Sequence, residues 1–145
     1  MKVRELMTGH VFRIHPEENV EVAARTLAQF NIGAMPVCSQ NGNLQGMITD
    51  RDLVIRCLAA GRDPSRTKVR DVMTNQVVTV APDTEVGVAA HLMGRQQVRR
   101  LPVAEQGRLC GMISLGDIAS QEESVMDAAD ALQDISGNIM EGMPW

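Results

Sequence analysis

The sequence contains very few aromatic residues, and this scarcity limits what its core and surface can do. Phe12, Phe30 and Trp145 are the only aromatic side chains in 145 residues. Aliphatic residues and methionine, which packs adaptably, must therefore fill the interior. The chain also lacks an aromatic platform on which nucleic-acid bases could stack, and its net charge of −4 argues against binding to phosphate backbones. We expect no nucleic-acid partner.

Long apolar runs are absent as well. No stretch approaches the roughly 20 apolar residues of a membrane-spanning helix. The beginning of the chain, Met1 to Glu5, lacks the apolar region of a signal peptide. We therefore expect a cytoplasmic protein that has no membrane partner.

Cysteine and histidine are sparse and irregularly spaced. Cys38, Cys57 and Cys110 lack CxxC spacing, which fits reduced structural thiols better than disulfides or a zinc site. A metal site shared by His10 or His15 with Cys38 would not match the usual ligand spacings. The chain offers no nucleophile paired with a base and no paired carboxylates outside predicted helix caps. We expect no bound metal and no enzyme activity.

The sequence does contain an internal repeat. Residues 3–8, Val-Arg-Glu-Leu-Met-Thr, recur at residues 69–74 as Val-Arg-Asp-Val-Met-Thr. The two copies are offset by 66 residues as far as Gln40 and by 65 residues after it, so a single deletion falls in a polar turn. We expect a first repeat at 1–66, a second at 67–121, and a C-terminal helix with a loose tail at 122–145, the tail beginning near Gly137.

Each copy predicts the element order β-α-β-β-α. In the first copy we expect strands at 11–14, 34–38 and 44–48 and helices at 20–31 and 50–60, and the second copy repeats the pattern. The proline inside each middle strand indicates an edge or a ligand-facing irregularity, because proline has no ladder N–H. A unit of about 60 residues is marginal alone. The expected fold class is therefore α+β: two β-α-β-β-α repeats packed with pseudo-twofold symmetry, plus a short C-terminal helix.

Periodic apolar positions predict which helix faces are buried. One face is expected in each of the two central helices and one in the C-terminal helix. The predicted positions are Val20, Ala23, Ala24, Leu27 and Ala28; Val86, Ala89, Ala90 and Met93; and Val125, Ala128, Ala129 and Leu132.

One stretch returns with its spacing intact. Residues 46–52, Gly-Met-Ile-Thr-Asp-Arg-Asp, recur at 111–117 as Gly-Met-Ile-Ser-Leu-Gly-Asp. The hydroxyl residue predicts a helix N-cap, and the aspartate three residues later predicts its capping-box partner. The same geometry also suits a ligand, because a helix N-terminus favours phosphate and a carboxylate can accept both hydroxyls of a ribose. Both interpretations stay open, and the repeated Gly-Met-Ile favours the second.

These motifs carry a resemblance to a known family. With Asp-Val-Met-Thr at 71–74, Val-Arg-Arg-Leu-Pro-Val at 98–103 and the two stretches above, the chain resembles a tandem pair of CBS domains (named after cystathionine β-synthase), often called a Bateman module. The resemblance covers Lys2 to Ala119, and the run from Ile48 to Arg56 is similar to stand-alone bacterial CBS-pair proteins.

The resemblance implies a regulatory module that binds an adenosine compound, either AMP, ADP, ATP or S-adenosylmethionine, in clefts between the copies. Asp52 and Asp117 would hold ribose, with Thr49 and Ser114 near phosphate. Ile14 and Val80, which end the first strands, are weaker candidates. The residues around the strand prolines, which would flank adenine, are Met35, Pro36, Val37, Leu101, Pro102 and Val103.

The two copies carry different cations. Arg51 of the first copy could pair with phosphate, although Asp50 would partly offset its charge. The second copy has Arg99 and Arg100 beside its adenine segment, so we expect Asp117 to mark the tighter site. A solvated surface or an ion pair between subunits is the alternative role for these arginines.

The expected function is energy or metabolite sensing that acts on a partner protein or through the chain's own homodimer. The alternative is a structural or interaction protein whose clefts are empty. A homodimer is expected because apolar helix positions outnumber those that one intramolecular packing would cover. These positions are Val22, Leu27, Leu53, Leu58, Val88 and Met93.

Overall fold

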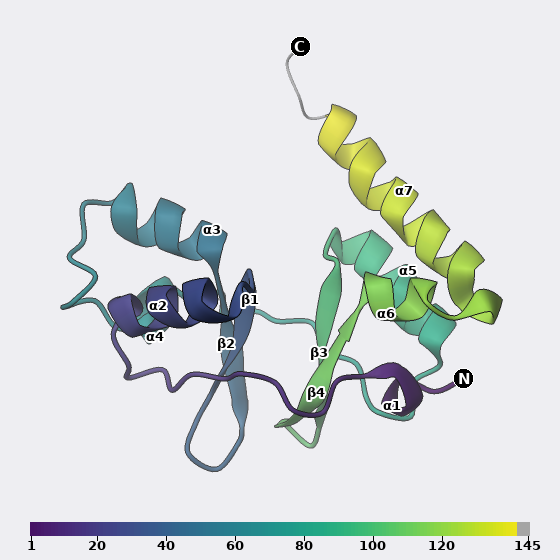
Figure 1. The fold of residues 1–145 in the computed structure, drawn as a ribbon, viewed down its shortest axis with the longest axis horizontal. Helices are drawn as coiled ribbons and strands as arrows, with labels where there is room; N and C mark the ends of the chain where they lie inside the picture. The colour runs from purple at the N-terminus through teal and green to yellow at the C-terminus, as the bar shows by residue number, and fades with distance from the viewer. Residues whose placement is uncertain (142–145) are drawn as a thin grey trace. The chain divides into compact units, whose positions relative to one another are not determined.

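The computed structural model describes residues 1–141, with side chains for residues 1–137 (Figure 1). The chain forms two compact units that do not coincide with the sequence repeats. Unit 1 comprises Met1–His10, Val78–Gln106 and the chain from Cys110 onward, whereas unit 2 comprises Val11–Val77 and Gly107–Leu109. The opening segment of each repeat therefore packs in the unit that holds the hairpin of the other repeat.

Unit 2 is built around an antiparallel hairpin, as the sequence predicted. Its first helix begins after Asn19, whose side-chain oxygen accepts a hydrogen bond from the Val22 N–H at 3.0 Å, and ends at Asn31 in the left-handed region (φ 51°). The elements are α2 (Val20–Phe30), β1 (Ala34–Cys38), β2 (Leu44–Thr49), α3 (Asp50–Asp52), the π-helix η1 (Leu53–Leu58) and α4 (Val69–Val72).

Unit 1 repeats this plan and adds a helix. Its hairpin consists of β3 and β4, which pair with each other. The elements are α1 (Val3–Leu6), α5 (Val86–Gln96), β3 (Arg100–Glu105), β4 (Arg108–Ser114), α6 (Leu115–Ala119), the short 3-10 helix η2 (Glu122–Ser124) and α7 (Val125–Glu141). The predicted fold class, α+β with one hairpin and its helices in each repeat, is confirmed.

The strands predicted at 11–14 and 77–80 are wrong as extended elements. Only Ile14 pairs in the first, through a parallel bridge to Val37, and only Val80 in the second, through a bridge to Val103. The next ladder bonds of a parallel pair around Ile14 would need N–H groups from Pro16 and Pro36, which proline lacks. The same holds for the prolines that flank the Val80 bridge, so each ladder stops after one residue.

The buried helix faces match the prediction fully only in α5, where all four predicted positions are buried. In α2, Ala24 and Ala28 are exposed although they were predicted to be buried. The prediction for α7 is largely wrong. Its buried residues are Ala128, Ala131 and Ile135, which join the core of unit 1, whereas Val125 and Leu132 are 43% and 42% exposed.

Two glycines explain how α7 sits on α5. A Cβ at Gly87 would lie 3.3 Å from a carboxylate oxygen of Asp127, and one at Gly94 would lie 3.0 Å from Asp134 and 3.3 Å from the Cα of Ala131. A side chain at Gly94 would thus crowd the backbone of α7, whereas at Gly87 only the end of the Asp127 side chain would have to move. The equivalent residues of α2 are Glu21 and Ala28, so the first repeat lacks this glycine surface.

The C-terminal helix is also longer than expected. α7 has 17 residues and continues through Gly137 to Glu141, where the loss of periodicity had predicted a loose tail. The rest of that predicted tail, residues 142–145, lies outside the described residues.

Candidate ligand sites

The repeated glycine before each hydroxyl residue has a packing role. In unit 2 the backbone groups of Thr74 and Met47 exchange hydrogen bonds of 2.8 and 3.0 Å, and a Cβ at Gly46 would lie 2.5 Å from the Thr74 carbonyl oxygen. In unit 1, Thr8 and Met112 pair in the same way beside Gly111. The glycine thus lets the opening segment of the other repeat lie against the hairpin, which is a reason for its repetition that involves no ligand.

The hydroxyl and the aspartate form capping boxes in both units, as predicted. Thr49 Oγ1 accepts from the Asp52 N–H at 3.0 Å, and Asp52 Oδ2 accepts from the Thr49 N–H at 3.0 Å. The corresponding distances between Ser114 and Asp117 are 3.0 and 2.9 Å. Each carboxylate is therefore held in one orientation, with one oxygen committed to the cap.

Asp52 is surrounded by further donors. Its side chain is buried, and the Thr74 hydroxyl donates to both carboxylate oxygens, at 3.3 and 3.4 Å. Arg56 Nε lies 3.7 Å from Oδ1, and Nη1 of the same residue donates to the Met73 carbonyl at 3.0 Å. Arg56 belongs to the π-helix η1. These contacts leave few acceptor positions on Asp52 for an incoming ribose.

Asp117 has a more open carboxylate. It is only half-buried, and within the described part of the chain its side chain accepts only from the Ser114 N–H. The residues equivalent to Thr74 and Arg56 are Thr8 and Gln121. Thr8 makes backbone bonds to Met112, and the Gln121 amide donates to Ser120. Asp117 therefore keeps acceptor positions that Asp52 has filled.

Most of the predicted adenine-flanking residues lie in the cores. Met35, Val37 and Val103 are fully buried and Leu101 is 2% exposed, so these side chains offer no surface to a ligand here. Pro36 and Pro102 lie on the opposite side of the strand pleat and are also buried. Ile14 and Val80 are buried members of the unit 2 and unit 1 cores, respectively. The assignment of these residues to adenine contact stays a prediction.

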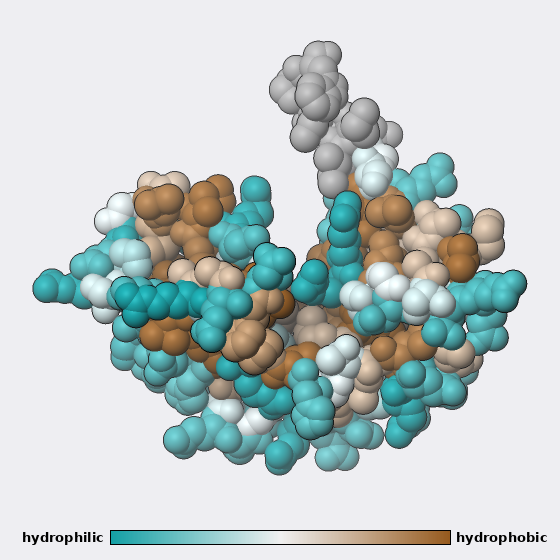
Figure 2. All heavy atoms as spheres, in the orientation of Figure 1, coloured by the Kyte–Doolittle hydropathy of each residue, from teal (hydrophilic) through white to brown (hydrophobic). Residues whose placement is uncertain are grey.

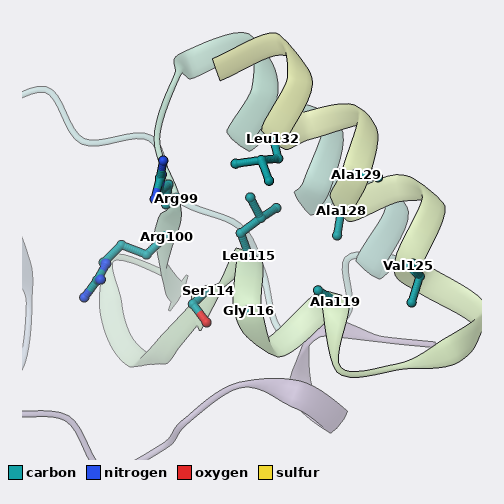
Figure 3. Close-up of a pocket in the computed structure, with 10 residues that line it drawn as sticks. All are labelled: Arg99, Arg100, Ser114, Leu115, Gly116, Ala119, Val125, Ala128, Ala129 and Leu132. Atoms are coloured by element: carbon teal, nitrogen blue, oxygen red, sulfur yellow. The ribbon is translucent and has the colours of Figure 1, made fainter. Parts of the chain in front are cut away.

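The predicted arginines are all exposed. Arg51, Arg99 and Arg100 make no ion pair with any residue that the structure describes. Arg99 and Arg100 line an open pocket of about 560 Å³ together with Ser114, α6 and α7 (Figure 3). Sequence reasoning missed Thr74 and Arg56, although the Met-Thr that ends the repeated segments 3–8 and 69–74 provided a signal for Thr74.

The described residues contain neither a metal-binding cluster nor a membrane-spanning helix. No group of three or more metal-ligating side chains lies close enough together to hold an ion within residues 1–137. None of the helices in the described part of the chain is long and apolar enough to cross a membrane. Cys38 and Cys57 are buried, and burial raises the pKa of the Cys38 thiol above its usual value.

A family model for the CBS domain matches the chain twice, at residues 3–58 and 69–124. The chain therefore belongs to the CBS-domain family and carries the domain as a tandem pair. It is 40% identical over 134 residues to the CBS domain-containing protein YhcV of Bacillus subtilis, an alignment that covers 92% of this chain and 94% of YhcV.

Solved CBS proteins share the fold. The crystal structure of Hypoxic Response Protein I with two coordinated zinc ions matches with a TM-score of 0.76 and 32% identity, over 83% of this chain and 98% of that one. The crystal structure of CBSX2 in complex with AMP matches with a TM-score of 0.73 and 26% identity, over 86% of this chain and 98% of that one. The CBS domain pair of MJ0100 in complex with 5′-methylthioadenosine and S-adenosyl-L-methionine matches with a TM-score of 0.72 and 25% identity, over 83% of this chain and 98% of that one.

Proposed function

We propose that this CBS pair is a non-catalytic, cytoplasmic regulatory module that binds an adenosine nucleotide at the Ser114–Asp117 site of unit 1. Asp117 accepts the vicinal ribose hydroxyls, and Ser114 with Arg99 and Arg100 holds phosphate. Two observations carry the proposal: the Asp117 carboxylate is open, and its capping partner Ser114 lines a pocket with two exposed arginines that have no ion-pair partner among the described residues. The CBSX2 complex with AMP supports the ligand class.

The arginines favour AMP, ADP or ATP over S-adenosylmethionine. Guanidinium groups form paired, charge-assisted hydrogen bonds with phosphate, and a phosphate carries more negative charge than the amino-acid group of S-adenosylmethionine. The MJ0100 complex keeps S-adenosylmethionine among the compounds to be tested.

Calorimetry on the purified protein tests the proposal. We expect AMP, ADP or ATP to bind, and Arg99→Ala and Arg100→Ala each to weaken binding about tenfold or more through the loss of charge-assisted hydrogen bonds. Arg62→Ala, which removes an exposed arginine of unit 2 outside both predicted sites, is the matched control. Absence of binding by every adenosine compound would favour the structural or interaction role with empty sites.

The contacts of Asp52 are the specific observation that favours this second candidate for unit 2. A carboxylate that already accepts from Thr74 and the Thr49 backbone, with Arg56 close by, can be a purely structural cap. Within the proposal, the Thr49–Asp52 site is therefore the weaker one, and Met35, Val37, Leu101 and Val103 support the strands from the cores instead of touching adenine.

A homodimer is part of the same proposal. Val54, Ile55 and Leu58 on η1 are 51%, 50% and 73% exposed, and Figure 2 shows apolar surface over this helix. Exposed apolar patches of this kind mark interaction surfaces. Sedimentation at micromolar concentration should show a dimer that Leu58→Asp weakens, whereas a wild-type monomer would contradict the dimer without bearing on nucleotide binding.

A further inference from the structure

The pocket beside Ser114 continues into an apolar groove that the nucleotide proposal does not use. In Figure 3 the side chains of Leu115 and Leu132 point toward each other, and α7 forms one wall. The groove is open, and Val125 and Leu132 are 43% and 42% exposed, whereas Leu115 and Ala128 are buried and form its floor. The apolar residues that line it are Leu115, Ala119, Val125, Ala128, Ala129 and Leu132.

The groove side of α7 carries no acidic residue, although the helix as a whole is acidic. Asp127 and Asp134 face α5, where their carboxylates approach Gly87 and Gly94. The four α7 residues that line the groove are valine, alanine, alanine and leucine. An anion that enters the groove therefore meets no like charge from its apolar wall.

The other end of the groove is cationic and polar. Arg99, Arg100 and Ser114 line it. In Figure 3 Arg99 stands on the side of Leu132, whereas the guanidinium of Arg100 extends away from α7. Neither arginine is neutralised by an ion pair within the described chain. Arginine binds phosphate and carboxylate through paired N–H donors. A cationic end that leads into an apolar groove complements a ligand with an anionic head and an apolar chain.

The groove uses a helix that lies outside the two CBS-domain matches. The second CBS match ends at residue 124, and α7 begins at Val125. Gly87 and Gly94 of α5 allow α7 to pack closely enough to form the wall. One wall of the groove is thus formed by residues C-terminal to the second CBS match.

We propose that this groove binds an anion with an apolar chain, an alkyl phosphate or a long-chain acyl anion. The head binds at Arg99, Arg100 and Ser114, and the chain lies along Leu115, Ala119 and the groove face of α7. The inference goes beyond nucleotide binding, but it shares the head-binding residues with it, so the two ligands compete unless one molecule carries both groups.

A chain-length series tests the apolar part of the site. Butyl, octyl and dodecyl phosphate are titrated into the full-length protein by calorimetry, below their micelle concentrations. Each methylene that enters the groove should tighten binding about fourfold until the groove is full, as expected for burial of apolar surface. Equal affinity along the series, or no binding by any member, overturns the proposal.

Substitutions on α7 test the location. Ala129→Asp and Leu132→Asp place a charge in the groove and should weaken dodecyl phosphate binding at least tenfold while AMP still binds. Met126→Asp is the matched control, because Met126 is on the same helix, is 71% exposed and does not line the groove. Circular dichroism and sedimentation show whether each variant remains folded and keeps its oligomeric state. Weakening by Met126→Asp equal to that by Leu132→Asp overturns the proposal, as does a change of oligomeric state, which would make the groove an interface between copies.

Comparing dodecanoate with lauroyl-coenzyme A shows whether the apolar ligand is a free acyl anion or part of an acyl-bearing nucleotide. Tighter binding of the thioester assigns the groove to an acyl-bearing nucleotide, and equal binding assigns it to a free acyl anion. Binding of dodecyl phosphate without AMP would refute the proposed function alone, whereas binding of AMP without chain-length dependence would refute this inference alone.

Discussion

The Thr74 hydroxyl lies 3.3 Å from Oδ1 of Asp52, a contact that joins the opening segment of the second repeat to the capping box of the first. Asp117, the repeat equivalent of Asp52, accepts no side-chain hydrogen bond from the described part of the chain. Two aspartates with the same local geometry therefore differ in how much of their hydrogen-bonding capacity remains. The difference arises from residues distant in sequence, not from the caps themselves.

Thr74→Val should destabilise the protein by about 1–3 kcal/mol, because the buried Asp52 carboxylate would lose a donor while the side-chain shape is kept. Thr8→Val, at the equivalent position, should change the free energy of unfolding by less than about 0.5 kcal/mol, because Thr8 is exposed. Urea unfolding of both variants measures the difference. Equal effects would show that the Thr74 contact contributes nothing specific to unit 2.

Asp117→Ala should weaken nucleotide binding by about 1.5–3 kcal/mol, or ten- to a hundredfold, because the ribose loses a charged acceptor. Asp52→Ala should act chiefly on stability, because its carboxylate already has protein partners. The sequence predicted that each aspartate controls one site, with Asp117 the tighter. Calorimetry on both variants shows which site binds nucleotide more tightly. A larger loss of binding in Asp52→Ala than in Asp117→Ala would make the Asp52 site the tighter one.

Gly94→Leu should displace α7 from α5, since even a Cβ at this position meets Asp134 at 3.0 Å and the backbone of Ala131 at 3.3 Å. Overpacking of this kind costs about 1–3 kcal/mol. Gly137→Ala on α7 is the control. A Cβ at Gly137 meets no atom within 4 Å, and alanine should stabilise the helix by up to about 1 kcal/mol. Thermal unfolding compares the stabilities of the two variants with that of the wild type. A Gly94→Leu protein with wild-type stability would mean that the packing of α7 does not depend on this contact.

The features that the sequence predicted well are local ones. The hairpins and the Thr49 and Ser114 caps depend on residues within a few positions of one another. They can therefore be predicted from local sequence patterns, without knowledge of the tertiary structure. Pro16 and Pro36 are visible in the sequence as well, but the sequence does not show that the two prolines act on one ladder. Only the parallel pairing of Ile14 with Val37 shows that together they end the ladder on both sides.

The features that the sequence did not predict depend on contacts between distant segments. The role of Gly46 requires Thr74 to lie against β2, and nothing near Gly46 indicates this. The buried face of α7 likewise depends on Gly87 and Gly94. Periodicity on α7 alone selected Val125 and Leu132, which form the groove instead of the core. In each case the missing information was the partner surface.

Within unit 2, Glu17 links the opening segment of the second repeat to the first repeat, and its ionisation should contribute to stability at neutral pH. Its carboxylate accepts hydrogen bonds from Lys68 Nζ at 2.7 Å and Arg70 Nη1 at 2.8 Å. The hydrogen bond from Lys68 is the main reason that the pKa of Glu17 lies below its usual value, with the charge of Arg70 adding to the effect.

Because the pKa of Glu17 is lower in the folded than in the unfolded chain, its contribution should be fully present above the unfolded pKa of about 4.3 and lost as pH falls through the folded pKa. Glu17→Gln should therefore be less stable than wild type at pH 7, and the difference should shrink below about pH 4. Salt near 1 M should reduce it as well, because these groups are exposed. Glu18→Gln, which alters an exposed neighbour with no ion pair among the described residues, is the control. Urea unfolding between pH 3 and pH 7 measures the effect, and a Glu17→Gln difference that is independent of pH would show that the pairing with Lys68 and Arg70 does not support the fold.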